Sequence, residues 1–192
     1  SVYGVVDGLF ISNIVGSTAF AAINLIVPVL MILGAIGFML GTGGSALVAK
    51  TLGEGKTEKA NQYFSMIVIF TIAMVLLFSL TGFIFMRPLA ELLGARGEIL
   101  DGCVVYGRTL MISLTGFMLQ NEFQSFLIVA EHPRMGLVMS ILCGVSNIIG
   151  DFLLVYVLRL GLVGAALATA FGELLGGIIP LIYFIFNKNT VL

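Results

Sequence analysis

Charged residues are scarce in this sequence. Lysine, arginine, aspartate and glutamate make up 10% of the 192 residues, whereas 59% are hydrophobic. A soluble domain carries about 25% charged residues, which help to cover its surface with polar groups. We therefore expect the surface of this chain to face lipid. The net charge of −1 gives no indication of a nucleic-acid partner.

Residues that bind metals or form cross-links are also few. The two cysteines, Cys103 and Cys143, lie in or beside apolar runs, and His132 is the single histidine. This composition predicts neither a zinc site nor a disulfide framework. The chain begins within one apolar stretch and ends soon after another. We therefore expect both ends to be interior positions of a longer protein.

Long uncharged runs divide the chain into segments that can cross a membrane. A helix needs about 20 apolar residues to span the hydrocarbon core, and backbone groups in lipid must be paired within the segment, as in a helix. Polar loops are expected at 50–61, 87–101 and 131–134. The pattern predicts an all-α integral membrane protein, a bundle of six transmembrane helices at about 1–13 (truncated), 19–49, 62–86, 102–130, 135–158 and 162–186.

The charges between these spans predict the orientation of the chain. Cytoplasmic loops carry an excess of lysine and arginine. One side collects five such residues, from loops 50–61 and 131–134 and from Lys188, whereas the other side collects three, from loop 87–101 and Arg159. We expect loops 50–61 and 131–134 of this multi-pass protein to be cytoplasmic, and the protein to lie in the cell (plasma) membrane.

Two glycine-containing patterns are better explained by structure than by chemistry. Residues 53–57 resemble the end of a phosphate-binding loop, but Lys50 occupies the position of its first glycine, and a membrane helix precedes the segment in place of a strand. Stripes of small residues let helix backbones approach closely. They recur every four positions at Gly37, Gly41, Ser45 and Ala49, and at Gly164, Ala168, Gly172 and Gly176.

Four carboxylates lie inside the predicted spans: Asp7, Glu122, Asp151 and Glu173. A charge at the bilayer centre costs about 2.5–3.5 kcal/mol on insertion scales, so such residues face a bundle interior or an aqueous cavity. Glu122 and Glu173 have the alternative of reaching headgroups or water from near a helix end. Asp7 and Asp151 have no cationic neighbour in the sequence and are the better candidates for a functional site.

Side-chain amides lie near these candidates. Asn147 precedes Asp151 by four residues, so the two share a helix face. A carboxylate beside an amide oxygen suits a proton or a hard cation such as Na⁺. Three more amides follow in the fourth span, at Gln120, Asn121 and Gln124. They either line a cavity or form interhelical hydrogen bonds, worth about 0.6 kcal/mol each.

Four segments resemble motifs of the multidrug and toxic compound extrusion (MATE) family. Residues 6–16 resemble its first-helix signature, and the resemblance continues at 43–56, 147–151 and 160–169. Together they cover nearly the whole chain in the family's order and spacing. Family members have twelve helices in two six-helix lobes. The resemblance therefore implies that this chain is the amino-terminal lobe of such a transporter, and that a carboxy-terminal six-helix lobe completes it.

The resemblance also implies roles for individual residues. Asp7, Asn147, Asp151 and Thr169 match positions implicated in binding the coupling proton or cation, so any metal ion would be Na⁺ held by these four. Gln120, Asn121 and Gln124 are expected to line the cavity of the lobe and contact substrate. The chain departs from many relatives next to both aspartates. Gly8 replaces a threonine and Phe152 replaces a proline, which leaves the local helix geometry open.

The resemblance implies a secondary antiporter and not an enzyme. It would export drug-like, often cationic organic compounds in exchange for H⁺ or Na⁺, without a cofactor, among membrane lipids. A lipid-linked oligosaccharide flippase of the same superfamily is the alternative, although such proteins tend to have a more basic cavity. An intramembrane aspartyl protease would need Gly-x-Gly-Asp, and Ile148 stands two positions before Gly150. A purely structural membrane subunit is a further alternative.

Overall fold

The computed structural model describes residues 14–186, and every regular element within them is helical. This confirms the predicted all-α class for the described part of the chain. The predicted first span, with Asp7, lies outside the described residues. In chain order the elements are α2 (Ser17–Gly53), α3 (Thr57–Leu92), α4 (Gly97–Val129), α5 (Pro133–Asp151), the π-helix η2 (Phe152–Val157) and α6 (Gly161–Phe186).

Five helical segments in this part of the chain are long and apolar enough to cross a membrane; α5 and η2 together form one of them. The 37 residues of α2 correspond to about 55 Å of helix. That length exceeds the hydrocarbon core of about 30 Å. Large apolar side chains such as Ile32, Met39 and Leu92 are exposed on the helix surfaces, as expected where lipid is the solvent. The chain is a multi-pass membrane protein.

The connections between the helices are shorter than predicted. The expected loop at 50–61 is wrong for most of its length, because α2 continues to Gly53 and α3 starts at Thr57. The expected loop at 87–101 is likewise reduced to the four residues between Leu92 and Gly97. Polar residues mark where a segment leaves the hydrocarbon, but they do not mark where its helix ends. The backbone hydrogen bonds of a helix can continue into water. Pro88 lies inside α3 and does not end it.

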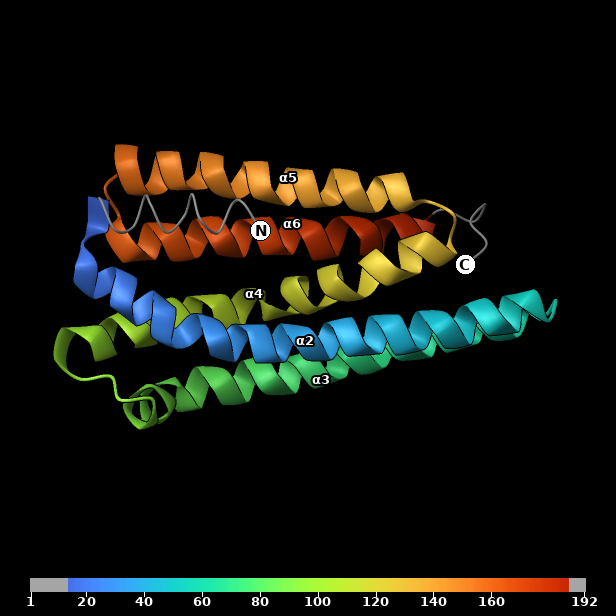
Figure 1. Ribbon diagram of the computed structural model, residues 1–192, viewed down its shortest axis with the longest axis horizontal. Coiled ribbons are helices and arrows are strands. Elements are labelled where there is room, and N and C mark those ends of the chain that lie inside the picture. Colours follow the sequence, from blue (N-terminus) through green and yellow to red (C-terminus); the bar gives the residue numbers. More distant parts are fainter. Residues whose placement is uncertain (1–13, 187–192) are drawn as a thin grey trace.

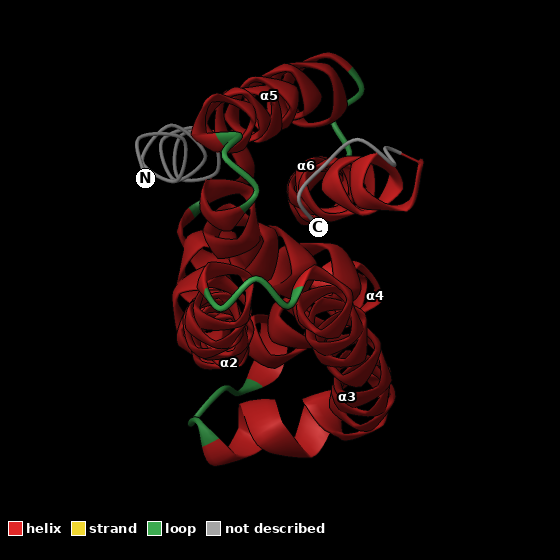
Figure 2. Cartoon of the chain, turned by 90° about the vertical axis from the view of Figure 1, so that its right-hand side faces the viewer, coloured by secondary structure: helices red, strands yellow, loops and turns green. Residues whose placement is uncertain are grey.

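Helix α4 occupies the centre of the bundle. It packs against α2, α3 and α6, whereas α5 packs mainly against α6. Figures 1 and 2 show α5 and α6 on one side of the molecule and α2 and α3 on the other, with α4 between them. Its fully buried rings Phe123 and Phe126 contact Phe64 of α3, and Phe123 also stacks on Phe184 of α6. The central helix therefore links the two helix pairs through its apolar side chains.

Glycines bring the helix backbones into direct contact. A Cβ atom added at Gly41 would lie 2.7 Å from the Cα of Glu122 in α4. A Cβ atom at Gly177 would lie 2.5 Å from the carbonyl oxygen of Gly116, where α6 meets α4. At Gly164 it would lie 2.8 Å from the carbonyl oxygen of Leu154 in η2. The distances at Gly41 and Gly164 confirm a packing role for the two small-residue stripes at these positions, and Gly177 makes a similar contact outside the predicted stripes.

Candidate ion-binding site

The candidate site lies where α5 packs against α6. These consecutive helices run side by side (Figure 1) and approach closely at Gly150, where an added Cβ atom would lie 2.8 Å from the Cβ of Ala168. This contact places Asn147 of α5 beside Thr169 of α6. The Asn147 Nδ2 donates a hydrogen bond of 3.2 Å to the Thr169 Oγ1. Two predicted site residues, 22 positions apart in the sequence, are thereby brought together.

Asp151 lies one helical turn beyond Asn147 and is fully buried. It is the last residue of α5, and the backbone changes to π-helix at Phe152. Short π segments in membrane and soluble helices often occur at functional sites. The departure from the family pattern at Phe152 therefore coincides with a change of helix geometry. The Phe152 ring stacks on Tyr156 one turn later, with 5.4 Å between the centroids.

A small cavity opens beside the Asn147–Thr169 pair. Its volume of about 30 Å³ has room for a water molecule or a bare ion, whereas pockets for organic ligands have about 300–1,000 Å³. The cavity can therefore hold part of an ion site but not a drug molecule. Side chains or backbone from three helices line it: Phe117 and Gln120 of α4, Cys143 and Asn147 of α5, and Thr169, Gly172 and Glu173 of α6.

Glu173 is the one acidic residue that lines this cavity. The Ser113 hydroxyl of α4 donates a hydrogen bond of 2.6 Å to the Glu173 Oε2. The sequence left the role of Glu173 open and gave Ser113 none. The spacing of Glu173 in the sequence could have indicated its role. Thr169 and Glu173 are four residues apart on α6, as Asn147 and Asp151 are on α5. Each helix thus presents a neutral oxygen ligand and a carboxylate on one face.

The other predicted polar residues of α4 have separate environments. Gln120 lines the cavity. The Asn121 Nδ2 donates to the Phe117 carbonyl oxygen of its own helix, at 2.8 Å. The Gln124 Nε2 donates to the Ser140 Oγ of α5, at 3.4 Å. Only Gln120 of the three therefore reaches the Asn147–Thr169 pair.

Glu122 lies apart from the cavity. Its side chain is fully buried in α4, where its backbone packs against Gly41 of α2. The alternative that Glu122 reaches headgroups or water from near a helix end is therefore wrong. The two glutamates left open by the sequence have different surroundings, and only Glu173 lies near predicted site residues.

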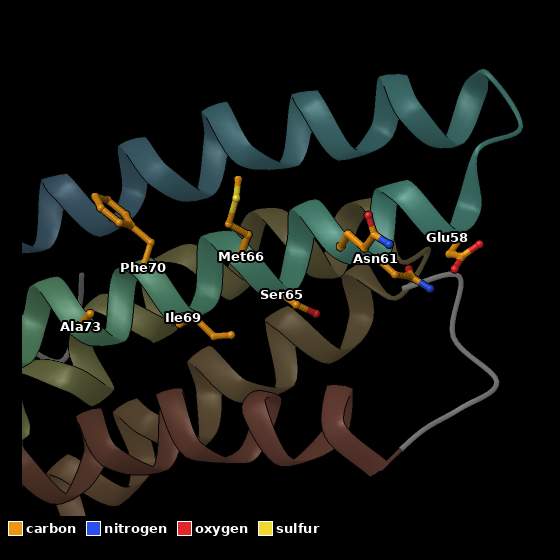
Figure 3. Close-up of a pocket in the computed structure, with 8 residues that line it drawn as sticks. Glu58, Asn61, Ser65, Met66, Ile69, Phe70 and Ala73 are labelled. Atoms are coloured by element: carbon orange, nitrogen blue, oxygen red, sulfur yellow. The ribbon is translucent and has the colours of Figure 1, made fainter.

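A broad groove on α3 does not resemble a binding site. It has a volume of about 840 Å³ and follows the outer face of α3. Figure 3 shows its lining side chains along that single helix, from Glu58 and Asn61 at one end to Phe70 and Ala73 at the other. A groove with walls from one helix cannot enclose a ligand on several sides.

The MatE family profile matches residues 1–153 of this chain. The chain belongs to the MATE family. Its curated relatives include the multidrug export protein MepA of Staphylococcus aureus strain MRSA252, which is 29% identical over 190 residues. That match covers 99% of this chain and 42% of the relative. MepA of Staphylococcus saprophyticus is 27% identical over the same length.

Solved structures of MATE transporters share the fold. An inward-facing multidrug resistance transporter of the family superposes with a TM-score of 0.92 at 24% identity, over 99% of this chain and 43% of that one. An outward-facing form gives the same TM-score of 0.92. This MATE chain therefore spans less than half the length of the relatives that it matches.

Proposed function

We propose that the chain is the amino-terminal lobe of a secondary active antiporter, which exports drug-like, often cationic organic compounds in exchange for H⁺ or Na⁺. The observation that carries this proposal is that Asn147 and Asp151 are buried on α5 and that Asn147 is hydrogen-bonded to Thr169 of α6. It lies in a membrane bundle, beside a cavity with no lysine, arginine or histidine in its lining. The relatives named multidrug export proteins support the choice of cargo.

The mechanism follows from the cost of burying a carboxylate. Asp7 and Asp151 would alternate between an ion-bound state and a state that permits substrate binding. A buried carboxylate without its ion is unfavourable, so the ion stabilises the conformation in which these groups are enclosed. Because an ion with different affinities for two conformations shifts their populations, its entry and release would drive alternating access.

An imposed-gradient experiment tests this function. The complete transporter is reconstituted into vesicles loaded with ethidium, without ATP, and an inward Na⁺ or H⁺ gradient is imposed. We expect one of the two gradients to accelerate ethidium export. An ionophore that collapses this gradient should return export to the rate measured in vesicles without protein. An export rate that neither gradient changes would show that the protein is not an antiporter driven by Na⁺ or H⁺.

The scarcity of basic side chains inside the spans bears on the alternative cargo. A flippase that moves an anionic lipid-linked oligosaccharide is expected to present basic side chains to it. Arg108 of α4 instead donates to the Phe83 carbonyl oxygen of α3, at 3.0 Å, and lies over the Phe83 ring. Arg108 is the only lysine or arginine inside the predicted spans among residues 14–186. This scarcity supports cationic cargo over a phosphate-bearing one.

The orientation of the lobe gives a separate prediction. Thr57 is exposed at the connection between α2 and α3, which the charge distribution predicts to be cytoplasmic. In intact cells, Thr57→Cys in the complete transporter should react less than one-tenth as much with a membrane-impermeant maleimide as it does after permeabilisation. Cys103 and Cys143 are buried, so they add little background. Equal labelling before and after permeabilisation would reverse the proposed orientation.

A further inference from the structure

We propose that Glu173 is the charged ligand of a second position for the coupling ion, formed with Asn147 and Thr169 and occupied by Na⁺. The proposal rests on the antiporter function above and adds to it a residue, a location and an ion. It makes the α5–α6 contact a two-position path instead of a single site at Asp151.

The two carboxylates lie on opposite sides of the Asn147–Thr169 pair. Helices α5 and α6 are antiparallel, because contacts at Gly150–Ala168 are followed by contacts at Leu154–Gly164. Asp151 is four residues from Asn147 toward the end of α5, and Glu173 is four residues from Thr169 in the other axial direction. Each step is about 6 Å along a helix axis. The carboxylates therefore belong to two positions along the contact, and the pair lies between them.

The cavity at the Glu173 position contains an unsatisfied acceptor. Asn147 is 4% exposed, and its Oδ1 accepts no hydrogen bond from any described residue. Its Nδ2 is already bonded to Thr169. A buried amide oxygen left without a donor costs about 1–3 kcal/mol. Within residues 14–186 this oxygen has no partner, and either a donor or a cation next to Asn147 would satisfy it.

The chemistry around this acceptor favours a cation over water. A water molecule satisfies the Asn147 Oδ1 but leaves the Glu173 charge uncompensated by any cavity-lining residue. A hard cation compensates both, because it takes amide, hydroxyl and carboxylate oxygens. Ser113 donates to one Glu173 oxygen, so the carboxylate is held in place while its other oxygen remains available. The volume of about 30 Å³ admits a bare ion and excludes an organic substrate.

The shared amide explains why two positions are useful. Asn147 neighbours Asp151 along α5 and contacts Thr169 across the helix interface. The positions at Asp151 and Glu173 can therefore each hold an ion that has an oxygen ligand from Asn147 or Thr169. The two carboxylates are about 12 Å apart along the axis, and an ion that passes between the positions keeps one of these ligands.

Sodium binding to the complete transporter tests the proposal directly. The purified protein is equilibrated with ²²Na⁺ in choline chloride at constant ionic strength, and bound ions are counted per protein. We expect Glu173→Gln to bind one Na⁺ fewer than the unmodified protein, and Ser113→Ala to weaken Na⁺ binding by about tenfold, as the loss of a supporting hydrogen bond does at metal sites. Glu122→Gln is the matched control, because Glu122 is a buried glutamate of the same bundle that does not line the cavity.

The outcomes separate this proposal from the proposed function. If Glu173→Gln and Glu122→Gln both bind Na⁺ as the unmodified protein does, or both lose it equally, the second position is wrong. Absence of Na⁺ binding by the unmodified protein also overturns it. If export is driven by a gradient but Glu173→Gln binds Na⁺ as the unmodified protein does, the antiporter function is supported and the second ion position is refuted. Loss of one Na⁺ in Glu173→Gln alone, without gradient-driven export, supports the ion position and refutes the antiporter function.

Discussion

Asp151→Asn should reduce export of ethidium by the complete transporter to the background of vesicles without protein, while expression and membrane insertion stay at normal levels. Asp151 is fully buried next to the hydrogen-bonded Asn147 and Thr169. The amide keeps the size of the side chain but cannot carry the charge that attracts a coupling ion. Removing a charge from a span also makes insertion easier by about 2.5–3.5 kcal/mol. Asp7→Asn should have the same effect on export.

Asp101→Asn is the matched control for this experiment. Asp101 undergoes the same chemical change, but its side chain is 73% exposed and lies 3.7 Å from Arg87. An exposed ion pair contributes about 0–1 kcal/mol, so export by this variant should equal that of the unmodified protein. The measurement is the initial rate of gradient-driven ethidium export at equal protein density. Normal export by both Asp7→Asn and Asp151→Asn would refute their role in coupling.

Gly177→Ala should strongly destabilise the lobe. The added Cβ atom would lie 2.5 Å from the Gly116 carbonyl oxygen and 2.6 Å from the Gly116 Cα. Both atoms are backbone, so no side chain can move aside, and α4 and α6 must separate instead. Forcing extra volume into a packed interior costs about 1–3 kcal/mol, and more where the neighbours are rigid. We expect a clear fall in the melting temperature of the purified transporter and a lower yield from membranes.

Gly43→Ala controls for the effect of replacing a helical glycine. No atom lies within 4 Å of the Cβ position at Gly43, which is also within α2. Alanine is favoured over glycine in a helix by about 1 kcal/mol, so this variant should melt at the same temperature or higher. Equal melting of Gly177→Ala and the unmodified protein would show that α4 and α6 do not depend on this backbone contact.

The interior of each described helix was predictable, whereas its ends were not. Uncharged runs require helices because lipid offers no partners to the backbone. The same argument does not apply where the chain leaves the hydrocarbon. Residues 50–53 and 57–61 belong to the expected polar loop and are still helical, since water permits either a helix or a loop. The change to π-helix after Asp151 was also outside what local sequence could predict.

The sequence by itself determined the environment of the chain, because scarce charge and long apolar runs leave no alternative to a helical membrane protein. It also placed Asn147 and Asp151 on one face, because that relation depends only on the helical repeat. Which helices touch was decided by tertiary packing. The Asn147–Thr169 bond, the Ser113–Glu173 bond and the cavity between them require α4, α5 and α6 to approach within contact distance. Glycine stripes permit that approach, but many pairs of stripes are compatible with one sequence, and only the assembled bundle selects among them.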